Sequence, residues 1–269
     1  MPVLEHTGPL ALRIEPGEIV SILGAPASGK TRVALELAFL AKPEEGEVLF
    51  HGVNPLKKKR ASEMRRPREV TLLVQNAEDQ LFAQTVFDDV AFGPRHLDIP
   101  EQEIEQRVVR ALKAVRLWPD EIRDRSPFAL SGGERRRVAL AGVLAMEPEV
   151  LILDEPSANL DPRTRNAFLE LLAPLRGKSA IVWLTVSARE AELADRIVLL
   201  DGGRMTEVRG GADLLRNWQA LASAGIELPA VYELAGALEQ RGLSLAPAGT
   251  PGEMTAAIIQ GWKGRHDDR

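Results

Sequence analysis

A glycine-bearing octapeptide near the N-terminus constrains this chain most. It reads Gly24-Ala25-Pro26-Ala27-Ser28-Gly29-Lys30-Thr31 and fits the pattern G-x-x-x-x-G-K-[ST]. The apolar run Glu18 to Leu23 precedes it, and Thr31 to Ala41, with apolar residues at helical spacing, follows it. In a strand–loop–helix of this kind, backbone N–H groups and a helix N-terminus surround phosphate oxygens. A chance glycine turn is the alternative, but it leaves the flanking strand and helix unexplained. The sequence therefore predicts a phosphate-binding loop.

Two residue types in this loop indicate which ligand it holds. Lys30, at the start of the helix, would reach the β- and γ-phosphates of a nucleotide, and the Thr31 hydroxyl would ligate Mg²⁺. We therefore expect ATP and Mg²⁺ as ligands.

Two carboxylates are expected at the end of another buried strand. Val150-Leu151-Ile152-Leu153 is an apolar run, and Asp154 and Glu155 follow it directly. The carboxyl ends of parallel strands form the edge at which α/β sheets bind ligands. Asp154 would hold Mg²⁺ through water, and Glu155 would polarise the attacking water as general base. A strand that simply ends at a polar turn gives the same short pattern, and the phosphate loop upstream is what favours the functional interpretation.

Short β-branched runs alternate with longer helical patterns along the chain, which is typical of an α/β fold with a parallel sheet. Further strands are expected at Val70 to Val74, Ala180 to Thr185 and Arg196 to Leu200, and a strongly amphipathic helix at 101–117. After Val208 the helical patterns become short and are broken by glycine and proline. We expect this tail to form a small C-terminal appendage.

The composition excludes several classes of protein. The chain has 269 residues, no cysteine and a net charge of −5, so disulfides, cysteine-ligated zinc and cysteine catalysis are excluded, and the bulk charge does not indicate nucleic acid. No signal peptide is expected at Met1 to Leu12, and no stretch approaches the roughly 18 apolar residues that a membrane helix needs. Lys57 to Arg68 is a basic cluster, either a solvated loop or hairpin edge or a contact with acidic lipid or a partner. Any membrane role must come through a partner.

A third motif links the chain to a known family. Leu130-Ser131-Gly132-Gly133-Glu134 precedes a helix and is a second glycine-rich helix N-terminus suited to phosphate. With it the sequence resembles the ATP-binding-cassette (ABC) family, because the phosphate loop, the Gln75 loop, the LSGG signature, the 150–154 strand with Glu155 and the 157–161 D-loop occur in the family's order. The resemblance implies an ATPase of two subunits packed head to tail, in which each signature closes on the nucleotide held by the other subunit.

The resemblance also implies a domain plan and residue roles. A P-loop NTPase (RecA-like) core would span 1–207, with a helical signature subdomain at about 76–134, and 208–269 would be an appendage for which dimerisation is one role. Gln75 and Glu155 would be catalytic, and Thr31, Gln75 and Asp154 would serve the metal ion. The nucleotide-binding residues would be Gly24, Ala25, Pro26, Ala27, Ser28, Gly29, Lys30, Thr31, Arg32, Ser131, Gly132, Gly133 and Glu134.

Two further stretches resemble the energy-coupling-factor (ECF) and cobalt-type transporter ATPases, which take up vitamins or metal ions. These stretches are 75–82 (QNAEDQLF) and 86–94 (VFDDVAFGP), and the helix at 140–146 and the tail segment 224–229 are similar to that group as well. The resemblance implies a second ATPase subunit, a transmembrane coupling subunit and a small membrane subunit that captures substrate. The region after Gln75 would contact the coupling subunit.

The chain departs from the family in three places. At the switch position, where the family has histidine, the sequence has Val186, unless a rerouted loop brings Ser187 into that role. No Phe, Tyr or Trp precedes Phe39, so the ring that stacks on adenine in the family is missing, and His6 is the only ring upstream of the phosphate loop. Inside the loop, Ala27 stands where the family prefers glycine and Arg32 where it prefers a hydroxyl. We expect the nucleotide site on this chain's own phosphate loop to be weakened and the signature to be intact.

The leading hypothesis is an ATP-hydrolysing subunit of an uptake transporter for a vitamin or metal ion, peripheral on the cytoplasmic face of the cell membrane and paired with a more typical ATPase subunit in a heterodimer. One alternative is a non-catalytic ATP-binding subunit that lends its signature to a partner. Another is a soluble, non-transport ABC ATPase. No nucleic-acid partner is expected, since the chain lacks the long coiled-coil insertions and the duplicated cassette of the maintenance proteins.

Overall fold

The fold comes from a computed structural model of the whole chain. The structure describes residues 1–57, 66–208 and 218–231, together with 234, 237–238, 241, 252 and 254–259. Most of the predicted basic cluster, residues 58–65, lies outside the described residues. Among the residues that are described, no helix is long and apolar enough to cross a membrane.

The chain divides into two compact units, and strand β3 (Ile19–Gly24) begins in the first and ends in the second. The first unit comprises residues 1–20 and 29–184, and the second comprises 21–28 and 185–269. The unit boundary therefore passes through the phosphate loop, between Ser28 and Gly29. The two units are described in turn.

The core of the first unit is a parallel sheet. Strands β5 (Val70–Leu73), β6 (Val150–Asp154) and β7 (Ala180–Thr185) pair in parallel in that order, and the start of β3 lies next to β7. All residues of β6 and β7 are buried. Their continuous apolar sequence follows from this position, because a parallel strand covered on both faces has no solvent side. A separate antiparallel sheet has the order β2 (Leu12–Ile14), β1 (Leu4–His6), β4 (Val48–Phe50).

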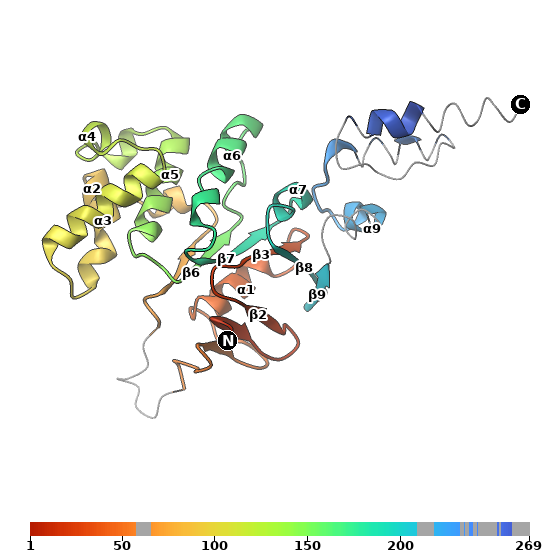
Figure 1. Cartoon of the computed structure of the whole chain (residues 1–269), viewed down its shortest axis with the longest axis horizontal. Helices are drawn as coiled ribbons and strands as arrows, with labels where there is room; N and C mark the ends of the chain where they lie inside the picture. Colours follow the sequence, from red (N-terminus) through yellow and green to blue (C-terminus); the bar gives the residue numbers. More distant parts are fainter. Residues whose placement is uncertain are drawn as a thin grey trace, which may run out of the picture. The chain divides into compact units, whose positions relative to one another are not determined.

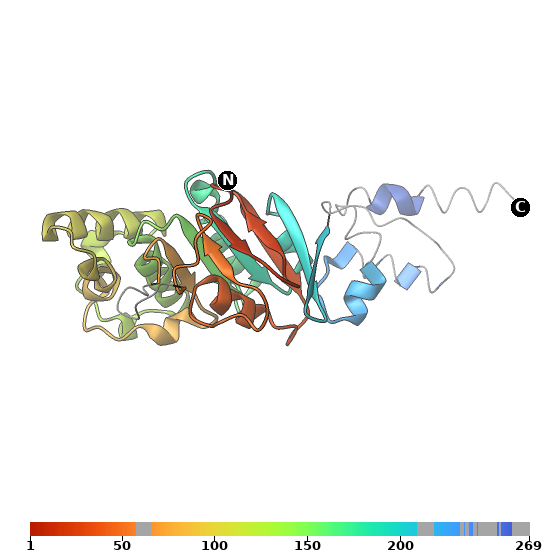
Figure 2. The same ribbon diagram turned by 90° about the horizontal axis from the view of Figure 1, so that it is seen from below.

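The helices of the first unit fall into two sets. Helix α1 (Lys30–Leu37) follows the phosphate loop, and α6 (Pro162–Leu169) follows the D-loop. The short helix η5 (Ala173–Leu175) comes after α6 in the chain. The remaining helices form a helical group, in which α2 and α3 both contact α5 and which Figure 1 and Figure 2 show gathered together in light orange, yellow and green. Its members are η2 (Ala77–Gln80), α2 (Val86–Phe92), η3 (Pro94–His96), α3 (Glu101–Ala114), α4 (Pro119–Ile122), η4 (Pro127–Ala129) and α5 (Gly132–Leu144).

The second unit packs the start of the C-terminal tail onto strand β3. Strands β8 (Arg196–Asp201) and β9 (Arg204–Val208) pair antiparallel, and the end of β3 lies next to β8. Helices α7 (Ala188–Ala191) and α9 (Trp218–Ser223) belong to the same unit. Leu221 and Ile226 of the tail share one buried cluster with Leu23 of β3.

The predicted elements agree with these strands and helices except at the C-terminal ends of two helices. The helix expected at 101–117 ends at Ala114, and Arg116, two residues later, has a φ of 57°. The sequence predicts a helix to Ala41, but α1 ends at Leu37. Phe39, only two residues later, has a φ of 58°. A left-handed residue ends an α-helix, because the next N–H turns away from the helix axis. The proposed boundary at residue 207 and the appendage function of 208–269 stay predictions.

Candidate functional site

The phosphate loop contains two residues with positive φ. Gly29, the N-cap of α1, has a φ of 96°, and Ala27 has a φ of 61°. The Ser28 N–H donates to the Ala25 carbonyl at 3.1 Å, which closes a turn between them. Glycine adopts a positive φ at no cost, but for an L-residue with a Cβ the left-handed region costs roughly 1–2 kcal/mol. The loop thus keeps the left-handed conformation at residue 27 although the sequence places an alanine there.

Three of the predicted site residues, all in the first unit, form one connected cluster. Lys30 and Gln75 both contact the carboxylate of Glu155. The ammonium Nζ of Lys30 lies 3.2 Å from Oε1 of Glu155. The side-chain amide Nε2 of Gln75 donates to Oε2 of the same carboxylate at 3.2 Å. The Lys30 side chain is 3% exposed and that of Glu155 is 19% exposed, so water screens this ion pair only partly.

The backbone of Glu155 is unusual. Its φ is 45°, and its N–H donates to the Leu184 carbonyl at 2.9 Å, beyond the end of β6. A charged residue held in the left-handed region is a strained conformation of the kind that clusters at functional sites. Strand β6 ends at Asp154, just before this residue, and the Glu155 carboxylate contacts Lys30 and Gln75.

Asp154 and Thr31 form the neighbouring part of the same cluster. Burial raises the pKa of the Asp154 carboxyl above its usual range, and the nearby Glu155 carboxylate raises it further, while a hydrogen bond from Thr31 and the charge of Lys30 oppose the rise. Oδ1 of Asp154 is buried and has no hydrogen-bond partner among the described residues. A carboxylate oxygen without a partner, next to a hydroxyl, is the donor set that suits Mg²⁺. Asp154 and Thr31 therefore fit the ion, and Gln75 as a third metal ligand stays a prediction.

Arg32 lies in the first turn of α1 and is held by two carboxylates. Its Nε donates to Oε1 of Glu36 at 2.9 Å, and its Nη1 lies 3.1 Å from Glu44. The other oxygen of Glu36 is 3.0 Å from Nε2 of His6, and both of these side chains are buried. The only ring upstream of the phosphate loop is thus inside the fold, where it cannot stack on a base. The guanidinium of Arg32 is half exposed, and its contact with a nucleotide stays a prediction.

The signature forms the N-terminus of α5. The N-cap is Ser131, whose hydroxyl accepts from the Glu134 N–H at 3.3 Å, while the Glu134 carboxylate accepts from the Ser131 N–H at 2.9 Å. This capping box satisfies two backbone donors that the helix start would leave free. The hydrogen bonds from Ser131 also hold the pKa of Glu134 below its usual range. Because the cap already uses this carboxylate, the role of Glu134 toward a nucleotide stays a prediction.

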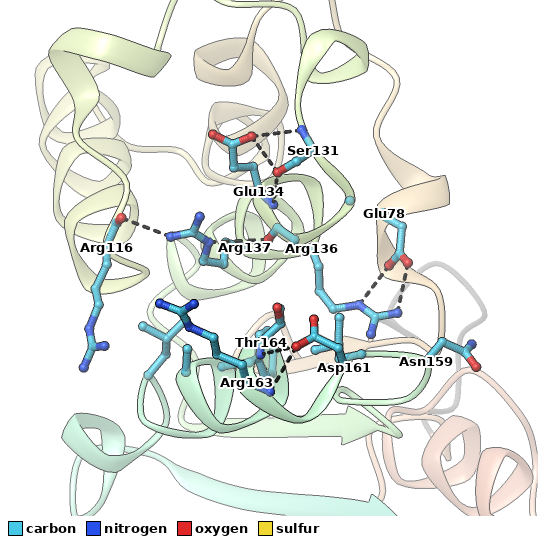
Figure 3. Close-up of a pocket in the computed structure, with 16 residues that line it drawn as sticks. Glu78, Arg116, Ser131, Glu134, Arg136, Arg137, Asn159, Asp161, Arg163 and Thr164 are labelled. Carbon is cyan, nitrogen blue, oxygen red and sulfur yellow. Dashed lines mark hydrogen bonds and ion pairs between the residues drawn. The ribbon is translucent and has the colours of Figure 1, made fainter.

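The signature residues line a cavity of about 690 Å³, which also reaches the start of α6 (Figure 3). Asp161 caps α6 through the N–H groups of Arg163 and Thr164. Four arginines line this cavity, namely Arg116, Arg136, Arg137 and Arg163. The sequence argument singled out none of the four. Arg136 and Arg137 follow the signature directly and look like ordinary surface charges until their neighbours are known, and Arg116 and Arg163 lie far from it in sequence.

In the second unit, the residue at the predicted switch position is bonded to the C-terminal tail. The carbonyl of Val186 accepts from the Glu227 N–H at 2.8 Å, and the Glu227 carbonyl accepts from the Ala188 N–H at 2.8 Å. The side chain of Ser187, the predicted substitute, is buried. Sequence reasoning missed this link, since the tail segment lies about 40 residues further along the chain.

Comparison with known proteins identifies the family. The ABC transporter family profile matches residues 8–158. The chain belongs to the ABC transporter family. The energy-coupling factor transporter ATP-binding protein EcfA2 of Symbiobacterium thermophilum is 40% identical over 255 residues, which are 94% of this chain and 88% of that protein. EcfA2 of Caldanaerobacter subterraneus is 37% identical over 237 residues, 87% of this chain and 82% of that protein.

Comparison with a solved structure supports the same family assignment for this ABC protein. The structure of CbiO1 from Clostridium perfringens, described as part of the ABC transporter complex CbiONQ, matches with a TM-score of 0.69 and 29% identity, covering 87% of this chain and 98% of that one. The predicted P-loop NTPase fold and the resemblance to the ECF group are therefore confirmed. This chain is an ATP-binding, ATP-hydrolysing ABC subunit of the ECF type.

Proposed function

We propose that this chain hydrolyses MgATP to energise an uptake transporter for a vitamin or a metal ion. It would work beside a second ATPase subunit and be bound to the cytoplasmic face of the membrane through a transmembrane coupling subunit. The observation that carries the proposal is the cluster in which Lys30 and Gln75 both contact the Glu155 carboxylate, next to Asp154. The names of the ECF-type relatives support the transporter assignment.

Each residue of this cluster has a separate role in the reaction. Lys30 binds the β- and γ-phosphates, and the N–H groups at the start of α1 add the favourable field of a helix N-terminus. Glu155 takes up a proton from the attacking water, and Gln75 orients this carboxylate through its amide hydrogen bond. Mg²⁺, held by Thr31, Gln75 and Asp154, would neutralise charge on the phosphate oxygens.

An exposed aromatic pair supports contact with a membrane subunit. Phe82 is 60% and Phe92 is 48% exposed, and their rings meet edge to face at 4.9 Å. Arg95 and Arg123 flank the nearby ring of Phe87. Exposed aromatic residues rimmed by charge are typical of protein interaction sites. They lie in the 75–92 region, which the resemblance to the ECF group assigns to the coupling subunit.

The site built on this chain's own phosphate loop is proposed to be slow. Val186 has no side-chain group that could donate to a γ-phosphate, and losing one preorganised donor costs roughly 10²–10³ in rate in other enzymes. The alternative is a non-catalytic subunit that binds ATP and contributes only its signature. The connected Lys30, Gln75 and Glu155 side chains favour hydrolysis, because a subunit that only binds ATP has no use for an oriented general base.

The test is ATP hydrolysis by the purified complex of this chain with its ATPase partner and membrane subunits. We expect transport into vesicles to stop when ATP is withheld. Glu155→Gln should lower the turnover of this chain's own site, measured with the partner's site disabled, to the background rate. Glu149→Gln, which removes a more exposed carboxylate just before β6, should have no effect. Equal turnover in the two variants would contradict hydrolysis by Glu155 and leave the binding-only alternative.

A further inference from the structure

One buried arginine of the first unit has a role that neither the motifs nor the comparisons assign. Arg136 lies one turn into the signature helix α5, and its side chain is only 3% exposed. A buried guanidinium is costly unless charged and polar partners satisfy it. Two segments from elsewhere in the sequence supply these partners.

The first partner is Glu78, in the short helix η2 that follows Gln75. Nε of Arg136 donates to one carboxylate oxygen at 3.1 Å and Nη2 donates to the other at 2.9 Å (Figure 3). This two-point fork fixes direction as well as distance, which a single ammonium group cannot do.

The second partner is the D-loop. Nη1 of Arg136 donates to the carbonyl oxygen of Ala158 at 2.5 Å. The N–H of Ala158 donates in turn to the carbonyl of Glu155 at 3.1 Å, so this tight turn also holds the general base.

The Gln75 segment and the D-loop are thus connected at two points. In each segment, the two connected residues lie three positions apart in the sequence. Gln75 contacts Glu155 directly, and Glu78 reaches Ala158 through Arg136. Two links at matching spacing define the position of one segment against the other, whereas a single side-chain hydrogen bond leaves it free to pivot.

We propose that Arg136 is a positioning residue, which keeps the Gln75 segment and the D-loop in register so that Gln75 and Glu155 stay aligned. This role rests on the proposed function, because the segment that Arg136 holds is the one proposed to contact the coupling subunit. A displacement of Glu78 by that contact is passed through the fork to Ala158 and to helix α5. In this role Arg136 acts through Gln75 and Glu155 and not by direct contact with substrate or Mg²⁺.

The first test is hydrogen exchange on the isolated full chain, which needs neither a transporter nor ATP hydrolysis. In Arg136→Gln, the amides of 76–80 and 156–160 should exchange at least tenfold faster than in the wild type. The matched control is Arg107→Gln in α3, which removes a largely buried arginine from its ion pairs with Glu103 of the same helix and with Glu147, which follows α5. The control should leave both segments unchanged. Unchanged exchange in Arg136→Gln would overturn the proposal.

The second test separates positioning from a purely structural role. In the assembled complex, with the partner's site disabled and well below the melting temperature, kcat of Arg136→Gln should fall roughly 10- to 100-fold, while KM for ATP changes less than twofold. Arg136→Lys should restore the melting temperature but not kcat, because lysine supplies the charge without the fork. Wild-type kcat in Arg136→Gln, or a raised KM alone, would overturn the positioning role.

A further variant covers the case in which Arg136→Gln does not assemble. Glu78→Gln leaves the arginine and its bond to Ala158 in place and should show the same direction of change in exchange and in kcat. Wild-type values for Glu78→Gln would overturn the proposal. If the wild-type complex itself hydrolyses no ATP, the proposed function fails, and the exchange experiment still decides the role of Arg136.

Discussion

The ion pair between Lys30 and Glu155 predicts that neutralising the general base tightens nucleotide binding. In the structure the Lys30 ammonium lies 3.2 Å from the Glu155 carboxylate. A bound phosphate needs the same ammonium and would also lie near the Glu155 charge. Glu155→Gln keeps the shape of the side chain but removes both the competition and the repulsion.

The size of the effect follows from the distance and the burial of the pair. The gross attraction between unit charges 3.2 Å apart is about 5 kcal/mol at an effective dielectric constant of about 20. Desolvation removes most of this, and a hydrogen bond to a charged group contributes a net of roughly 1.5–3 kcal/mol. Because the Glu155 side chain is 19% exposed and water weakens the pair, we take the lower end of this range of net free energies. About 1.5 kcal/mol corresponds to a dissociation constant about tenfold tighter.

The assay is an equilibrium titration of the isolated chain with a non-hydrolysable ATP analogue in the presence of EDTA. Without Mg²⁺, the titration reports mainly the contact between Lys30 and the phosphates. Glu149→Gln, at a carboxylate that pairs with His51 instead, is the control and should bind like the wild type.

A double variant makes the test specific to the ion pair. In a Lys30→Ala background, Glu155→Gln should give much less tightening, because the competition for the ammonium no longer exists. If Glu155→Gln alone leaves the affinity unchanged or weaker in a folded protein, or if the gain persists in full without Lys30, the pair does not compete with phosphate and the reasoning is wrong.

Four further outcomes are expected. Lys30→Ala should weaken ATP binding by tenfold or more in a calorimetric titration, since it removes the buried cation at the start of α1. Ala27→Gly should raise the free energy of unfolding by about 1 kcal/mol in a denaturant titration, because glycine adopts the φ of 61° without strain; an unchanged or lower value would mean that this residue is relaxed. Phe82→Ala should abolish transport into vesicles while leaving the melting temperature of the isolated chain unchanged, as expected for an exposed contact side chain. In the assembled complex, Ser131→Arg should reduce steady-state ATPase far more than Glu155→Gln, because it blocks the partner's competent site; equal losses would show that this chain's own site is not slow.

The motifs specify the functional residues of the first unit because their chemistry depends on local sequence. A glycine loop between a strand and a helix places Lys30 and Thr31 at a helix N-terminus in any α/β fold. An apolar strand that ends in two acids places Asp154 and Glu155 at the sheet edge for the same reason. The order of the motifs also sufficed to predict the family, and the alternation of strand and helix patterns sufficed to predict the parallel sheet.

Only the tertiary structure decides how residues far apart in sequence combine. The fork between Arg136 and Glu78 joins positions 58 residues apart, and nothing in either local sequence specifies the partner of the other. Similarly, the buried pair of His6 and Glu36 removes from the surface a ring that the sequence left available for a base. Propensity and motif spacing act over a few residues, whereas the free energy of a buried charge depends on whatever the fold brings within about 3 Å of it. Local sequence therefore determines the chemistry of the site, and long-range packing determines which side chains hold that chemistry in place.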